Sequence, residues 1–275
     1  MNKDLLYIDS HAHIGDQAFD KDRADIVSRL IASGTNMLVE IGCTPKEWKP
    51  AIELAEQYPQ NIYACLGFHP IYANTYNKEE ENHLASLLKN EKVVALGEIG
   101  LDYDHSNATQ EFQREVFVKM LKFAEKADLP LVLHCRKSPT PEDFSAYKDL
   151  LNLIEKNYKA NPQRKFQGIL HCFSGRLEDA QRAIKLGFLI GVNSIIGYKG
   201  KKNDPLRQTI KKIGIENIVL ETDCPYLPPQ SKRGERNEPS FIPEIAQTVA
   251  DVLEISLKEV AQKTTANTKA VYNIK

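Results

Sequence analysis

The sequence predicts an α/β fold, a (β/α)8 TIM barrel that takes up residues 1–275 as a single domain. Eight short apolar runs each lead into an amphipathic helical stretch, and successive runs begin roughly 20–40 residues apart. A length of 275 residues suits one barrel of this kind. A doubly wound open sheet is the alternative, but it would have fewer strands and a glycine-rich phosphate turn after the first one. The chain lacks that turn.

The expected strands are short runs of apolar, mostly β-branched residues. They lie near residues 5–9, 37–42, 62–67, 93–99, 130–135, 168–172, 187–192 and 217–222. Apolar residues recur at helical spacing near residues 22–33, 46–58, 78–89, 109–127, 141–159, 177–186, 205–213, 240–252 and 257–272. Residues 225–239 contain four prolines. A loop of that length after the last strand indicates a functional segment, because barrel active sites lie at this end.

Composition limits the possible partners and the compartment. The net charge of −1 means that any contact with nucleic acid must come from a local patch. We see no apolar stretch that would form a signal peptide or a membrane span. The five cysteines are an odd count without CxxC spacing, which is typical of reduced thiols in the cytoplasm. We therefore expect a cytoplasmic protein that makes no membrane contact and needs no obligate protein partner, and we expect a monomer.

Potential metal ligands stand at the ends of five of the expected strands. His11 and His13 follow the first run, and side chains two residues apart on a strand point to the same side. The other candidates end the fourth, fifth, sixth and eighth runs: Glu98, His134, His171 and Asp223. Because all strands of a parallel barrel end at the same mouth, these six side chains can converge there.

Six candidate ligands exceed what one catalytic zinc ion needs, since such an ion usually has three protein ligands and an open position. The surplus favours two metal ions with a carboxylate between them. Cys135, Cys172 and Cys224 each follow a candidate ligand. We expect them to be apolar filler, because neighbouring strand residues point to opposite faces. His83 and His105 lie in polar segments and are expected to be solvated.

Several motifs together resemble the TatD family of metal-dependent nucleases. These motifs are Asp9-Ser10-His11-Ala12-His13, Gly67-Phe68-His69-Pro70, Gly97-Glu98-Ile99-Gly100-Leu101-Asp102-Tyr103, His171-Cys172-Phe173-Ser174-Gly175, Glu221-Thr222-Asp223-Cys224-Pro225-Tyr226 and Arg233-Gly234-Glu235-Arg236-Asn237-Glu238-Pro239. The resemblance runs from about residue 7 to about residue 272, in the family's order and approximate spacing.

The resemblance implies a barrel of the metal-dependent hydrolase type with two divalent metal ions, which could be Zn, Mn or Mg. It implies that His11, His13 and Asp223 hold one ion and that His134 and His171 hold the other. Glu98 would bridge the two ions, and His69 would face the substrate phosphate.

The chain departs from the family pattern in two places. Arg136 leads into Lys137-Ser138-Pro139-Thr140-Pro141 rather than into an acidic residue and alanine, and the loop after Tyr103 lacks a basic residue often found there. Both departures concern the substrate side of the site.

The expected activity is hydrolysis of DNA phosphodiester bonds by a two-metal-activated water, as a 3′-5′ exonuclease on single strands or ends. Asp223 would help to deprotonate the water, Glu98 is the second catalytic residue, and Arg136 would offset developing phosphoryl charge. Residues that could contact phosphates or stack on bases are Lys199, Lys201, Lys202, Lys232, Arg233, Arg236, Tyr72, Tyr103 and Tyr226. The alternatives are a D-aminoacyl-tRNA deacylase, another ester or phosphoester hydrolase, and a non-enzymatic metal-binding module.

Overall fold

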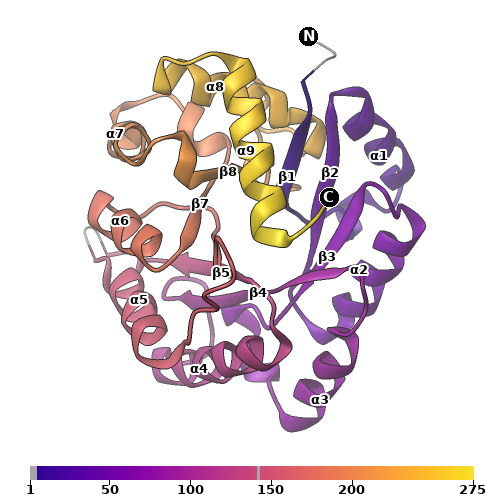
Figure 1. Ribbon diagram of the computed structural model, residues 1–275, viewed down its shortest axis with the longest axis vertical. Coiled ribbons are helices and arrows are strands. Elements are labelled where there is room, and N and C mark those ends of the chain that lie inside the picture. The colour runs from indigo at the N-terminus through magenta and orange to yellow at the C-terminus, as the bar shows by residue number, and fades with distance from the viewer. Residues whose placement is uncertain (1–4, 141–142) are drawn as a thin grey trace.

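Eight parallel strands follow one another in sequence order around one sheet, with helices on the outside (Figure 1). The computed structural model describes residues 5–140 and 143–275. The strands are β1 (Tyr7–Ala12), β2 (Thr35–Gly42), β3 (Ile62–Leu66), β4 (Val93–Asp102), β5 (Leu131–Arg136), β6 (Gly168–Leu170), β7 (Phe188–Val192) and β8 (Ile218–Leu220). The predicted (β/α)8 barrel is confirmed.

The helices alternate with the strands, and two of them follow β8. They are α1 (Arg23–Ala32), α2 (Pro45–Gln57), α3 (Lys78–Leu87), α4 (Gln110–Ala127), α5 (Ser145–Asn157), α6 (Leu177–Lys185), α7 (Asp204–Ile213), α8 (Ile242–Leu253) and α9 (Leu257–Tyr272). The expected helix 141–159 begins instead at Ser145, and residues 141–142 lie outside the described residues. The expected helix 240–252 begins at Ile242, because Pro239–Phe241 form a separate 3-10 turn.

Two strands are longer at their carboxyl ends than expected. β1 continues through His11 to Ala12, and β4 continues to Asp102, where it still pairs with Arg136 of β5. Gly100 permits this close pairing: its φ is +147°, and a Cβ there would lie 2.0 Å from the carbonyl oxygen of His134. The extension of β4 therefore brings Asp102 beside the end of β5.

The barrel interior is filled by small and branched apolar side chains. Ile8, Val39, Val132 and Ile169 belong to this inner cluster, which also contains residues from the carboxyl end of α9. Tyr272 of α9 is buried there, and its hydroxyl donates to the carbonyl oxygen of Ser10 at 2.8 Å. In Figure 1, α9 lies in front of the ring of strands, and the residues at its carboxyl end cover one end of the barrel interior.

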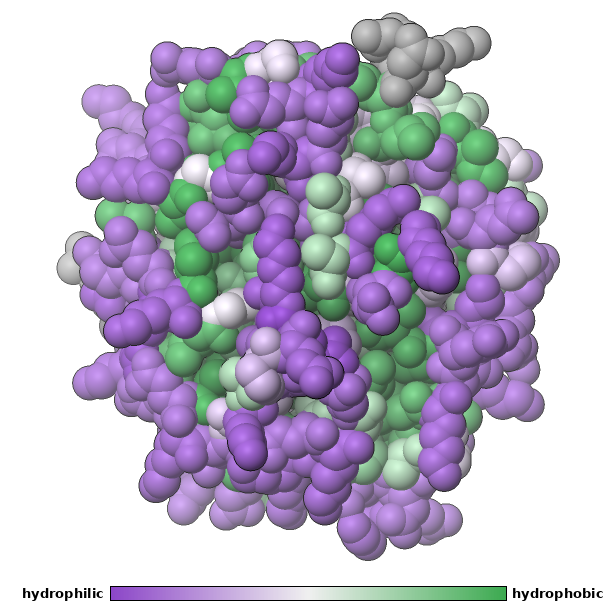
Figure 2. Space-filling view, in the orientation of Figure 1, coloured by the Kyte–Doolittle hydropathy of each residue, from purple (hydrophilic) through white to green (hydrophobic). Residues whose placement is uncertain are grey.

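The outer surface carries mainly polar side chains. Figure 2 shows hydrophilic residues over most of the face on which α9 lies, with apolar residues visible between them. Across residues 5–140 and 143–275, no helix has both the length and the apolarity that a bilayer crossing requires. Four large apolar or aromatic side chains in this part of the chain are exposed, namely Leu6, Ile31, Tyr72 and Tyr226.

The barrel closes between β8 and β1 through contacts on either side of the candidate ligands. The Asp223 amide donates to the carbonyl oxygen of His11 at 3.0 Å, and the His13 amide donates to that of Cys224 at 2.9 Å. Nearby, the Thr222 amide and hydroxyl donate to the two oxygens of the buried Asp9 carboxyl group, at 2.9 and 2.5 Å. These bonds fix the relative positions of the first and last strands.

We expect Thr222→Val to destabilise the metal-free protein by about 1–3 kcal/mol, because it leaves one oxygen of the buried Asp9 carboxyl group without its hydroxyl donor. Urea unfolding followed by circular dichroism measures this free energy. Thr222→Ser keeps the hydroxyl and is the matched control. Equal stability of the valine and serine variants would show that this hydrogen bond does not hold the closure.

Candidate metal centre at the barrel mouth

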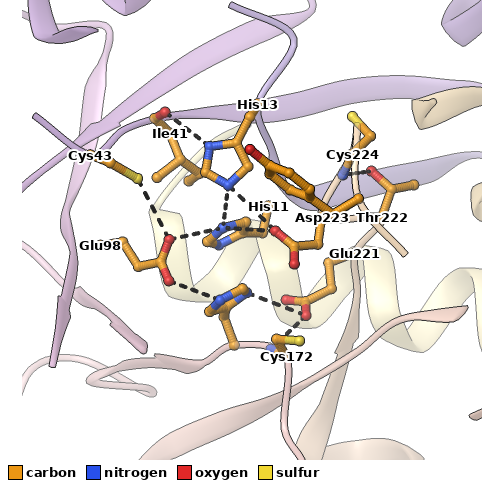
Figure 3. Close-up of polar contacts among 12 residues, drawn as sticks. His11, His13, Ile41, Cys43, Glu98, Cys172, Glu221, Thr222, Asp223 and Cys224 are labelled. Atoms are coloured by element: carbon orange, nitrogen blue, oxygen red, sulfur yellow. Dashed lines mark hydrogen bonds and ion pairs between the residues drawn. The ribbon is translucent and has the colours of Figure 1, made fainter. Parts of the chain in front are cut away.

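Four candidate ligands from β1, β4 and the end of β8 form a first cluster. His11 Nε2 lies 3.2 Å from His13 Nε2, 3.4 Å from Glu98 Oε2 and 3.7 Å from Asp223 Oδ1. His13 Nε2 lies 3.4 Å from the same Asp223 oxygen. Figure 3 shows His11 between the Glu98 and Asp223 carboxylates, with His13 directed toward the same point.

A second cluster forms around the other oxygen of Glu98. Glu98 Oε1 lies 2.6 Å from His134 Nδ1, 2.9 Å from His171 Nε2 and 3.3 Å from His69 Nε2. The His171 ring also stacks on the His11 ring, with centroids 3.7 Å apart. Glu98 therefore presents one oxygen to each cluster.

Glu98 is almost fully buried, and its environment keeps it ionised. Burial alone would raise its pKa, but the four surrounding imidazoles outweigh burial and hold the pKa well below its ordinary value. Asp223 behaves in the same way: burial opposes ionisation, while the hydrogen bond from His13 and the neighbouring imidazoles lower its pKa. Both carboxylates are thus in the anionic form that binds metal.

The separations between the donor atoms of the first cluster fit a divalent metal ion. Bond lengths of 2.0–2.2 Å place tetrahedral ligands about 3.3–3.6 Å from one another. The separations of 3.2–3.7 Å in the first cluster lie close to this range. The Nε2 atoms of His11 and His171 face Glu98, at 3.4 and 2.9 Å, so each ring directs its Nε2 edge into a cluster.

His69 differs from the other imidazoles because its Nδ1 accepts a hydrogen bond from the Ile71 amide at 3.2 Å. Burial lowers its pKa to about 4, so the ring is neutral near pH 7. In a neutral ring whose Nδ1 is an acceptor, the proton must be on Nε2. The Nε2–H that faces Glu98 and His134 is therefore a donor, which suits a contact with a phosphate oxygen better than a bond to metal.

Two carboxylates that the sequence analysis gave no role support the histidines of the second cluster. His134 Nε2 lies 3.1 Å from Asp102 Oδ2, and His171 Nδ1 lies 3.5 Å from the buried Glu221 Oε1. Carboxylates beside metal-binding histidines orient the rings and raise their basicity. The sequence signal for Asp102 was available, because it follows Glu98 by four residues in the same strand and so lies on the same side. Glu221 follows the end of β8 at Leu220, and Asp223 has a φ of +57°, so strand alternation does not relate these two residues.

Two further residues near the centre were also missed. The thiol of Cys43 lies 3.8 Å from Glu98 Oε2, as Figure 3 shows. Glu40, on β2, accepts hydrogen bonds from the Ile14 and Gly15 amides and so holds the loop after His13. No periodic pattern marks Glu40, because its role depends on a loop that is distant in the sequence.

The rim residues have separate positions. Arg136 Nε lies 3.6 Å from Asp102 Oδ2, and its Nη1 lies 2.7 Å from Nδ1 of the exposed His105. Arg236 forms an ion pair with Asp22 at 2.6 Å, so this cation has a structural partner. Lys199, Lys201 and Arg233 are exposed, Lys232 is half-buried, and the side chain of Lys202 is not among those described.

Two tyrosines lie at the mouth of the barrel. The ring centroid of Tyr226 is 6.2 Å from that of His13, and the ring centroid of Tyr72 is 6.2 Å from that of His69.

Three kinds of comparison with known proteins point to the same family. The family model described as TatD related DNase matches residues 8–273. The Bacillus subtilis protein named uncharacterized metal-dependent hydrolase YabD is 31% identical over 98% of this chain and 100% of its own length. A protein of Escherichia fergusonii named 3′-5′ ssDNA/RNA exonuclease TatD is 31% identical over 93% of this chain and 95% of its own. The crystal structure of YjjV, a TatD homolog from Escherichia coli K12, superposes with a TM-score of 0.87 at 28% identity, covering 98% of both chains.

The metal-free protein should lose stability as the pH rises from about 6.5 to about 9. Burial lowers the pKa of His13, but the hydrogen bond with Asp223 and the nearby carboxylates outweigh it and raise the pKa to about 9. A folded-state pKa above the unfolded value of about 6.5 adds stability below pH 6.5 that disappears as the folded group deprotonates. Urea unfolding in EDTA across this range measures the loss.

The His13→Asn variant is the control for this prediction, since it removes the titrating group. Its stability should change less with pH over the same range. Equal slopes for the wild-type protein and the variant would contradict the assignment to His13.

Asp102→Asn should weaken metal binding at the second cluster by about 10–100-fold, because it removes the negative charge beside His134. The backbone amides of Asp104 and His105 donate hydrogen bonds to Asp102 Oδ1 at 3.0 and 2.8 Å. The asparagine keeps an oxygen that can accept both of them. Competition titration with a chelating dye reports the affinity. Asp149→Asn, which loses a carboxylate that contacts no site histidine, is the control. Unchanged affinity in Asp102→Asn would exclude the positioning role.

Proposed function

The chain belongs to the TatD family of metal-dependent hydrolases, and we propose that it is a two-metal 3′-5′ exonuclease acting on single-stranded DNA or on DNA ends. The observation that carries the proposal is the position of Glu98. Its two carboxylate oxygens face two separate sets of imidazoles, at 3.4 Å on one side and 2.6–3.3 Å on the other. A carboxylate placed between two ligand sets can hold two ions close together, and a close pair of ions is what two-metal phosphodiesterases use.

The relatives support the choice of substrate. One of them, 31% identical over 93% of this chain, is named a 3′-5′ ssDNA/RNA exonuclease. The described cysteines are all free, in keeping with the cytoplasmic location that belongs to the proposal. The proposal also takes the enzyme to act as a monomer.

In the proposed site His11, His13 and Asp223 would hold one divalent ion, and His134 and His171 would hold the other. Glu98 would be the carboxylate that both ions share. When bound, such a pair of ions lowers the pKa of a coordinated water and offsets charge on the phosphodiester oxygens. A mixed imidazole and carboxylate set suits Zn or Mn, and Mg is the third candidate.

The chain's own groups would move the proton and bind the phosphate. Asp223 directs Oδ1 toward His11 and His13, which leaves Oδ2 to accept a proton from the attacking water. His69, neutral and protonated on Nε2, donates to a phosphoryl oxygen. Arg136 supplies a positive charge at the rim, where Asp102 and His105 hold its side chain.

Two exposed tyrosines would bind the end of the strand. Tyr72 is 39% exposed and Tyr226 is 56% exposed, and each lies beside an imidazole of the centre. Exposed aromatic rings stack on unpaired bases without regard to sequence. Stacking at the mouth favours a single-stranded terminus over a duplex, because only unpaired bases present their faces.

Glu98→Ala should lower hydrolysis of a single-stranded DNA oligonucleotide by at least ~100-fold, because it removes the ligand shared by both clusters. The assay follows oligonucleotides labelled at the 5′ or the 3′ end, with metal-stripped protein to which Mg, Mn or Zn is added back. A ladder of shortened 5′-labelled products is expected. Glu53→Ala, in which an exposed carboxylate of α2 is removed, is the control and should retain activity.

Other results would redirect the assignment. A 5′-to-3′ order of products would overturn the polarity, and near wild-type turnover of Glu98→Ala would overturn the two-metal scheme. An intact oligonucleotide under every metal, with hydrolysis of a D-aminoacyl-tRNA ester offered in parallel, would assign the site to ester hydrolysis.

A further inference from the structure

A groove of about 830 Å³ lies beside the proposed metal centre, on the side of the barrel where α5, α6 and α7 follow one another (Figure 1). Its inner end comes from the loops that carry the ligands. Lys137 lies three residues after His134, and Ser174 lies three residues after His171. From there the groove continues along α7. It therefore leads away from the mouth over the outside of the molecule.

The described lining of this groove is strongly positive. It contains five cations, Lys137, Arg176, Lys199, Lys212 and Arg233, and a single carboxylate, that of Glu178. Arg176 is also paired with the buried Asp179 carboxylate at 3.3 Å, but its side chain remains 53% exposed. The chain as a whole has a net charge of −1, so this concentration of positive charge is local. A groove of this charge attracts a polyanion by releasing the counterions of its phosphates.

Aromatic rings alternate with these cations. Lys137 Nζ lies 5.2 Å from the centroid of the Phe144 ring, and the Arg176 guanidinium lies 4.9 Å from the same ring. On the other side, the Arg233 guanidinium lies 4.4 Å above the ring of Tyr198. The Tyr198 hydroxyl donates to the carbonyl oxygen of Pro228 at 3.0 Å, which fixes that ring.

We propose that this groove binds the part of a single-stranded nucleic acid that leads away from the bond being cut. Phosphates would contact the cations, and bases would stack on the Phe144 ring and on the guanidinium of Arg233. An acidic protein segment would use the cations but has no bases to stack on the rings, so the combination favours nucleic acid. The inference rests on the proposed exonuclease function, and it specifies where the rest of the substrate strand lies on the protein.

The test compares binding of a fluorescent thymidylate dodecamer with phosphorothioate linkages, by anisotropy at several salt concentrations. The metal-loaded protein is used first, and the measurement is repeated in EDTA. Lys137→Gln/Arg176→Gln should weaken binding by about 10-fold or more and reduce the salt slope by roughly 1.4, since each single-strand phosphate contact contributes about 0.7. The control is Lys156→Gln/Lys185→Gln. It removes two exposed charges from the carboxyl ends of α5 and α6, whereas the groove residues lie at the amino ends of these helices.

Binding that is equal in the groove variant and the control would overturn the groove assignment. Displacement of the dodecamer by a glutamate-rich peptide of the same charge would also overturn it, in favour of a general anion surface. Phe144→Leu gives an independent arm: it should weaken binding without changing the salt slope, because it removes stacking and no charge.

Hydrolysis separates this inference from the proposed function. In the groove variant, kcat/KM should fall much more for a dodecamer than for a thymidine dinucleotide, because the dinucleotide is too short to occupy the groove. An equal fall for both substrates would contradict the groove and leave the exonuclease intact. No hydrolysis of either substrate by the wild-type enzyme would instead contradict the exonuclease.

Discussion

The buried Glu98 carboxylate among four imidazoles is the interaction on which the rest of the site depends. An ionised carboxylate in the interior is costly unless it is hydrogen-bonded and paired. His69 and His134 lie on or just after the strands beside β4. His11 and His171 come from farther round the sheet, so Glu98 has all four imidazoles only in the curved barrel. Asp102 and Glu221 then hold the histidines from behind. The outer carboxylates thus orient the histidines, and the histidines in turn surround Glu98.

Much of this arrangement follows from the sequence. The eight strands and nine α-helices of residues 5–140 and 143–275 were predicted close to their observed positions, because each combines a clear period with a polar boundary. The candidate ligands were found because histidines and acidic residues, among them a His-x-His pair, stand at the ends of five of the apolar runs. The convergence of those strand ends at one mouth is a property of parallel barrels in general.

What the sequence did not predict depends on contacts between distant segments. The proton position on His69 is decided by the Ile71 amide, and that hydrogen bond exists only in the turn that follows β3. The continuation of β4 to Asp102 depends on pairing with β5, and Gly100 allows that pairing. Cys43 reaches Glu98 only because β2 and β4 lie in the same barrel. Periodicity describes one segment at a time and cannot reveal such partners.

The contact between β1 and the segment after β8 also affects when the site can form during synthesis on the ribosome. The first candidate ligand, His11, emerges from the ribosome more than two hundred residues before its neighbour Asp223, and Tyr272, which bonds to Ser10, comes later still. Until then the early histidines belong to an open, incomplete sheet. A nascent chain can therefore hold only part of the ligand set. The candidate ligand set is complete only once Asp223 has been added, so a chain that stops short of that residue lacks one member of the first cluster.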